Sequence, residues 1–182
     1  MTQYARPDSD VSDGNWLNSA DNNTNLYSYV DEDPSCGSAP CYDDSDYIYA
    51  VDQWGSTEIC ILGLGDVTDP SSAADHKITV RALETVGFGG VDLNVILQQG
   101  TTTIRSHTFN PSTGFANYTT TLTSSQANAI TDYSDLRIKI SATDQMGSEA
   151  TTQVSWAYFE CPDASAPSAT ATPEAFLLFL DP

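Results

Sequence analysis

The clearest pattern of apolar and polar positions spans residues 91–109. Over its first half apolar residues alternate with polar ones, the period of two expected where one face of a strand is buried. The alternating apolar residues are Val91, Leu93, Val95 and Leu97. Gly100 falls where a short loop needs a positive φ. Residues 104–109, rich in β-forming residues, are then expected to form a second strand that runs back beside the first. The pattern predicts a β-hairpin, and other strands must cover its apolar face because a lone hairpin is marginal in water.

Similar short patterns recur along the chain, with turn residues between them. Further strands are predicted at residues 47–51, 59–64, 77–83, 115–122, 136–143 and 153–161. The one helical turn is expected at 124–130, after a Ser or Thr cap. Short strands without βαβ alternation predict an all-β fold, an antiparallel β-sandwich with jelly-roll topology. An immunoglobulin topology is disfavoured because Cys60 and Cys161 do not flank a strand-borne Trp at the required distances.

Composition divides the 182 residues into three parts. Residues 1–46 are polar and acidic but carry interspersed Trp, Tyr and Leu, which predicts an extended arm packed on the sandwich rather than disorder. Within this arm, residues 26–30 are expected to form a short strand or a turn of helix. Residues 47–161 form the predicted sandwich domain. Residues 162–182 are a Pro/Ala/Ser/Thr linker followed by an apolar end.

The charge balance narrows the choice of partners. Six Lys and Arg against 25 Asp and Glu give a formal net charge of −19. Such a field repels phosphate backbones and anionic membrane surfaces, so neither nucleic acid nor membrane is expected as a partner. No apolar run approaches the roughly 18 residues of a spanning helix.

The four cysteines bear on the compartment in which the protein works. Cys36 and Cys41 flank a short polar loop, which indicates either a disulfide staple or two reduced thiols. The N-terminus lacks the basic and apolar regions of a secretory signal, so we expect synthesis in a cytoplasm, and a disulfide would then form after release. The staple is the prediction adopted here. Cys60 and Cys161 are expected to be buried, with a bond between them left open.

Candidate metal and catalytic chemistry is sparse. The acids at 31–33 and 43–46 contain the hard oxygen ligands that Ca²⁺ prefers, but without EF-hand spacing they are better interpreted as solvated turn acids. We therefore predict no cofactor, with a structural Ca²⁺ as a weakly supported alternative. No carboxylate pair suited to glycoside hydrolysis and no nucleophile–base motif is visible, so no catalytic residue is predicted. His76 and His107 are expected at the surface.

The three tryptophans, Trp16, Trp54 and Trp156, offer flat apolar faces of the kind on which a sugar ring can stack. Trp156 is assigned to the core face of its strand, together with Val154 and Tyr158, because the three follow one alternation. Trp54, in a loop, is the one tryptophan left open for glycan contact, although core or interface packing is the favoured interpretation.

The C-terminal end predicts a docking segment. Its consecutive apolar residues are Phe176, Leu177, Leu178, Phe179 and Leu180. Left in water they would forgo about 1.5 to 3 kcal/mol each, so something must cover them. The linker, at about 3.3 Å per residue, can carry them some 30 Å from the sandwich. We expect them to pack on a partner, with folding back onto their own sandwich as the alternative.

Two regions resemble a known family. They are residues 6–12, 16, 26–27, 31–32 and 43–48 at the front, and residues 130–136 and 154–157 at the back. They are similar to tailed-bacteriophage and prophage structural proteins, whose single domain resembles a jelly roll of the carbohydrate-binding-module type. The resemblance implies a virion location and capsid or other virion proteins as partners. The segment between Cys36 and Cys41 and the tail after Cys161 depart from the family.

Two functions follow as hypotheses. The first is a non-enzymatic virion structural protein, a capsid decoration or cement protein that attaches through its terminal arm and is homo-oligomeric. The alternative is a carbohydrate-binding module, or another phage surface or tail adhesion protein that recognises glycan. An enzyme ranks third.

Overall fold

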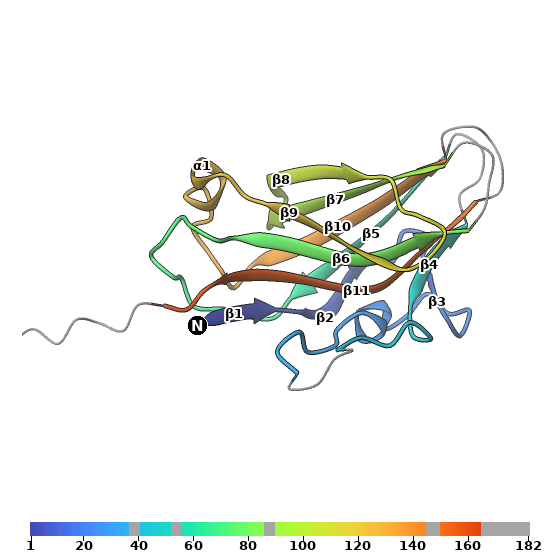
Figure 1. The fold of residues 1–182 in the computed structure, drawn as a ribbon, viewed down its shortest axis with the longest axis horizontal. Coiled ribbons are helices and arrows are strands. Elements are labelled where there is room, and N and C mark those ends of the chain that lie inside the picture. The colour runs from blue at the N-terminus through green and yellow to red at the C-terminus, as the bar shows by residue number, and fades with distance from the viewer. Residues whose placement is uncertain (37–40, 52–55, 86–89, 145–149, 165–182) are drawn as a thin grey trace, which may run out of the picture.

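The computed structural model describes residues 1–36, 41–51, 56–85, 90–144 and 150–164, which form two antiparallel β-sheets packed face to face (Figure 1). The strands are β1 (Thr2–Ala5), β2 (Pro7–Ser12), β3 (Leu17–Asn18), β4 (Ile48–Val51), β5 (Thr57–Leu64), β6 (Lys77–Glu84), β7 (Val91–Gln99), β8 (Thr102–Phe109), β9 (Ala116–Thr121), β10 (Leu136–Asp144) and β11 (Thr151–Pro162). A 3₁₀ helix, η1 (Leu26–Tyr29), and a short helix, α1 (Ser124–Ala127), complete the elements.

The strand order is that of a jelly roll, so the predicted fold class is confirmed. We call one sheet the β11 sheet. Its strand order is β3-β4-β11-β6-β9, and β1 is also paired to β11. The other, the β10 sheet, has the order β2-β5-β10-β7-β8. From β4 onward the chain changes sheet at every connection except the β7–β8 hairpin.

The predicted hairpin is confirmed. The four alternating apolar residues of β7 are 0% exposed, and their partners on β8 run antiparallel from Leu93–Phe109 to Gln99–Thr102. Gly100 has a φ of +56°, and its N–H donates to the Asp135 carbonyl oxygen at 2.9 Å. The turn therefore fixes the hairpin and also joins it to the loop before β10.

The interior is filled from both sheets, as the alternation predicts. Inward residues of β10 and β7 meet those of β6 and β11 in one apolar cluster. His76 also lies inside, at 0% exposure, where its Nε2 is 2.7 Å from the Tyr133 hydroxyl and its Nδ1 is 2.8 Å from the Ala74 carbonyl oxygen. The prediction of a surface His76 is wrong, because both ring nitrogens find partners and the ring can be buried without an unsatisfied polar atom.

Trp156 does not belong to the core face of β11, contrary to the prediction. The β11–β6 register shifts between Val154 and Trp156, which places an additional residue in β11. Val154 and Ala157 both enter the core cluster, whereas Trp156 and Tyr158 lie on the outer face of the sheet. The bulge thus turns the rings of Trp156 and Tyr158 outward, whereas strict alternation would place both in the interior.

The N-terminal arm contributes strands to both sheets. β1 pairs with the end of β11, from Thr2–Pro162 to Ala5–Phe159, and β2 pairs with β5 in the other sheet. η1 begins where both carboxylate oxygens of Asp10 accept the backbone N–H groups of Leu26 and Tyr27 at 2.9 and 2.8 Å. The prediction of a short strand or turn of helix at 26–30 is met by this 3₁₀ turn.

The cysteines and the tail complete the description of the chain. Cys36 and Cys41 are joined by a disulfide, and Cys60 and Cys161 are buried free thiols.

Trp54 and the apolar residues 176–180 lie outside the described residues, so the glycan-contact and docking predictions for them stay predictions. No helix within the described ranges is long and apolar enough to cross a membrane.

Candidate functional site

A row of aromatic rings crosses the outer face of the β11 sheet. The ring centroids of Tyr42 and Trp156 are 5.7 Å apart, those of Trp156 and Tyr158 4.8 Å, and those of Tyr158 and Tyr4 5.7 Å. Trp156 is only 6% exposed, and its indole N–H donates to the Glu32 carbonyl oxygen at 2.9 Å. Trp156 is therefore covered by the arm, while Tyr4 ends the row at the sheet edge.

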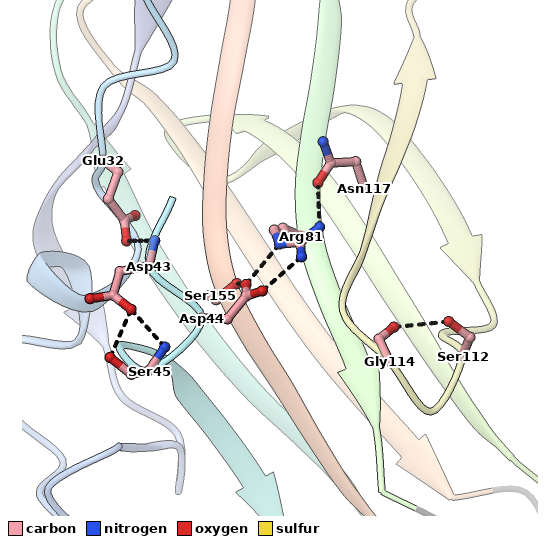
Figure 2. A network of polar contacts seen from close by, with 9 residues as sticks. All are labelled: Glu32, Asp43, Asp44, Ser45, Arg81, Ser112, Gly114, Asn117 and Ser155. Carbon is pink, nitrogen blue, oxygen red and sulfur yellow. Dashed lines mark hydrogen bonds and ion pairs between the residues drawn. The ribbon is translucent and has the colours of Figure 1, made fainter. Parts of the chain in front are cut away.

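An ion pair holds the arm against this face (Figure 2). Both carboxylate oxygens of Asp44 are 2.7 Å from guanidinium nitrogens of Arg81 on β6, and Ser155 donates a further hydrogen bond to Asp44 at 2.9 Å. The guanidinium also lies 3.9 Å from the ring centroid of Tyr42. The hydrogen bond from Arg81 lowers the pKa of Asp44. This bidentate pair fixes residues 42–44 on the sheet.

Two carboxylates of the two acidic clusters, those of Asp33 and Asp43, have local structural roles. Asp33 accepts from the backbone N–H and hydroxyl of Ser35, and Asp43 accepts in the same way from Ser45. These hydrogen bonds lower the pKa of both acids. Within the described residues no group of three or more His, Cys, Asp or Glu side chains is arranged to hold a metal ion. Asp33 and Asp43 are therefore turn-forming acids.

Glu32 and Asp46 differ from these turn acids. Among the described side chains, Glu32 Oε2 and Asp46 Oδ1 are buried without a hydrogen-bond partner. Burial is the first cause that raises the pKa of Glu32 to about 7, and the nearby charges of Asp46 and Asp31 raise it further. Burial also raises the pKa of Asp46. The Glu32 carboxylate therefore takes up a proton near neutral pH.

A groove lies where the chain crosses from one sheet to the other. β1 belongs to the β11 sheet and β2 to the β10 sheet, with Arg6 between them. We name it the Tyr4 groove; it has a volume of about 330 Å³ and is lined by Tyr4, Arg6, Pro7, Asp8, Tyr27, Asp31, Gly65 and Asp66. The Arg6 guanidinium donates to the Asp31 carbonyl oxygen at 2.7 Å, which ties the crossing to the arm.

The Tyr4 groove combines two aromatic side chains with a guanidinium and three carboxylates. Tyr4 and Tyr27 are half-buried, while Arg6, Asp8 and Asp66 are exposed. Such walls offer apolar ring surface for contact and charged groups for hydrogen bonds to a polar ligand. Sequence reasoning did not single out this site, because its residues come from four separate stretches. The only local signals were the turn residues Gly65 and Asp66 and the Arg6-Pro7-Asp8 run.

No family model matches the chain, and no curated protein does. Similar solved structures include a CBM4 module, with 13% identity and a TM-score of 0.41 over 82% of this chain and 92% of that chain. TmCBM61 in complex with β-1,4-galactotriose has 10% identity and a TM-score of 0.41 over 64% and 71%. The Stig cyclase Fisc from Fischerella sp. TAU has 14% identity and a TM-score of 0.43 over 91% and 92%. These values are too low to carry over what any of these proteins binds.

Proposed function

We propose that this protein is a non-catalytic module that binds a carbohydrate in the Tyr4 groove. The observation that carries the proposal is the composition of the groove, in which Tyr4 and Tyr27 flank carboxylates and one guanidinium. Pyranose rings have apolar faces that pack on aromatic side chains and hydroxyl rims that need hydrogen-bond partners. The groove offers both kinds of contact side by side.

The charge of the groove favours neutral sugars. Sugar hydroxyls donate well to carboxylates, since a hydrogen bond to a charged acceptor is stronger than one between neutral groups. Asp8, Asp31 and Asp66 supply such acceptors, and only Arg6 supplies a cationic donor. With a net charge of −19 the protein also repels uronates and phosphorylated glycans. Neutral polysaccharides are therefore the proposed ligand class.

Titration calorimetry with neutral oligosaccharides tests this function. The probes are cello-, xylo-, manno- and galacto-oligosaccharides, with oligogalacturonates as the anionic comparison. We expect saturable binding of at least one neutral series and none of the uronates. Tyr4→Ala should weaken that binding roughly tenfold through loss of ring contact, while Tyr47→Ala, which removes a half-buried tyrosine that does not line the groove, should leave it unchanged. Absence of saturable binding to any neutral glycan would refute the proposal.

Placement on a virion is a separate proposal, and the support for it is the sequence resemblance to phage structural proteins. The Cys36–Cys41 disulfide favours work outside a reducing cytosol, which fits a virion surface and a secreted module equally. A glycan-binding phage surface protein would unite the two hypotheses. The capsid-decoration role rests on residues 176–180 and stays a prediction. Mass spectrometry of purified particles would detect the protein if it is a virion component.

A further inference from the structure

A second hollow adjoins the Tyr4 groove. It has a volume of about 260 Å³ and shares Asp8 and Asp66 with the Tyr4 groove. We name it the Arg137 hollow; beyond the two shared acids, its polar lining residues are Ser9, Ser134, Asp135 and Arg137. These residues come from β2, from β10 and from the loop before β10. Because two acids border both spaces, the two spaces adjoin and outline one path. It runs from the crossing between β1 and β2 over the edge strand β2 and over β5 to Arg137 on β10.

Two glycines, Gly63 and Gly65, line the bottom of this path, where a side chain would take up space. A Cβ added to Gly63 would lie 2.3 Å from Ser9 Oγ and 3.5 Å from Asp8 Oδ1. A Cβ added to Gly65 would lie 3.8 Å from Asp8 Oδ2. The Asp8 carboxylate therefore lies over Gly63 of β5 and over Gly65 just after β5, neither of which has a side chain. Any other residue at position 63 would push the Ser9 side chain out of place and fill the junction between the hollows.

The far end of the path is rigid and polar. Arg137 Nη2 is 3.0 Å from Asp135 Oδ1, and the Arg137 side chain is 28% exposed. Asp132 accepts from the backbone N–H and hydroxyl of Ser134, and the Asp135 carbonyl oxygen accepts from the Gly100 N–H. The hairpin turn and the loop before β10 hold each other in place, so these groups are set before a ligand binds. Preorganised groups lose little freedom on binding.

We propose that the ligand of this protein is an extended linear glycan whose successive sugars occupy the Tyr4 groove and the Arg137 hollow, with Asp8 and Asp66 at the junction. This inference rests on the proposed function and specifies its ligand: an internal stretch of a neutral chain instead of a single terminal sugar. Tyr4 and Tyr27 provide ring contact at one end. Arg137, Asp135 and Ser134 provide donors and acceptors for hydroxyl groups at the other.

The test is the dependence of affinity on chain length. In the oligosaccharide series that binds, chains of two to six sugars are titrated against the wild type, Arg137→Gln and Lys139→Gln. Lys139 is the next outward cation on β10 and does not line the Arg137 hollow, so it is the matched control. We expect the wild type to bind the tetrasaccharide at least tenfold more tightly than the disaccharide. In Arg137→Gln that ratio should fall several-fold, and in Lys139→Gln it should stay as in the wild type.

The outcomes separate this inference from the function on which it rests. If no neutral saccharide binds, the proposed function fails. If saccharides bind, Tyr4→Ala weakens them, and affinity is independent of chain length in both the wild type and Arg137→Gln, the inference fails while the function stands. A second variant, Gly63→Ser, fills the junction and should reduce tetrasaccharide affinity more than disaccharide affinity. Circular dichroism and the unfolding midpoint of each variant confirm that the sandwich is intact.

Discussion

The β7–β8 hairpin and the arm segments 31–36 and 41–46 are held to the molecule by different kinds of interaction. β7 completely buries four alternating side chains, all of them apolar. Residues 31–36 and 41–46 are instead held on the outer face of the β11 sheet by polar contacts. These include the bidentate ion pair of Asp44 with Arg81, the hydrogen bond from Ser155 to Asp44 and the one from Trp156 to the Glu32 carbonyl oxygen. Apolar burial is non-directional and tolerates small shifts, whereas carboxylate hydrogen bonds depend on geometry and on protonation. Substitutions in the two regions should therefore differ in size and in pH dependence.

The largest effect is expected for Leu97→Ala in β7. Leu97 is 0% exposed in the core, and truncation leaves a cavity, so unfolding should become easier by about 2 to 5 kcal/mol. Urea denaturation measures the change. Thr103→Ala, at an exposed position on the partner strand β8, is the control and should change stability by less than about 0.5 kcal/mol. Equal effects of the two substitutions would contradict the assignment of the core.

The next effect is expected at Arg81, the anchor of the arm. The Arg81 side chain is 12% exposed, and Arg81→Ala leaves the Asp44 carboxylate without its bidentate donor. The loss should be about 1 to 3 kcal/mol, and residues 41–46 should become more sensitive to protease. Arg81→Lys keeps the charge but not the two-pronged geometry, so an intermediate loss is expected. Unchanged protease resistance in Arg81→Ala would show that the ion pair does not hold the arm.

A smaller loss is expected when the cap of η1 is removed. Asp10→Ala takes away both acceptors of the Leu26 and Tyr27 N–H groups and should cost about 1 kcal/mol, the usual value for a lost helix cap. Amide exchange at these two residues should accelerate more than exchange in β7. Asp10→Asn retains one acceptor oxygen and should recover part of the protection. If exchange at 26–27 is as slow in Asp10→Ala as in the wild type, the capping role is refuted.

The smallest effect is a pH dependence centred on Glu32. Its folded pKa of about 7 lies above the ordinary value, so the folded state binds the proton more tightly than the unfolded state. The resulting stabilisation is fully present below about pH 4.5 and is lost as the pH rises through 7. The melting temperature should therefore fall as the pH rises from about 4.5 to about 7.

Glu32→Gln mimics the protonated side chain and should remove this part of the pH dependence. The Trp156 indole N–H signal, which reports the contact with the Glu32 carbonyl, should titrate near pH 7 in the wild type and not in Glu32→Gln. Asp92→Asn, which removes one carboxylate from β7 in the opposite sheet, should retain the titration. A titration that persists in Glu32→Gln would assign the proton to another acid, with Asp46 the first candidate.

Where alternation is unbroken, the sequence alone was sufficient to predict local structure. The inward residues of β7 and β10, the positive φ of Gly100 and the capped turn at Thr123 all follow from patterns a few residues long. These features depend on side-chain period, glycine freedom and a cap that bonds its own helix, each of which acts between near neighbours. The all-β sandwich could therefore be predicted before any long-range contact was known.

Long-range contacts decided the rest. The bulge at Val154 and Trp156 reversed the facing of two aromatic rings, and His76 was buried because Tyr133, 57 residues later, supplies a partner. The Tyr4 groove joins residues from β1, β2, η1 and the end of β5, which meet only because the chain crosses between sheets at Arg6. No local sequence pattern encodes this groove, because the pairing of distant strands brings its residues together. No single segment forms a groove on its own.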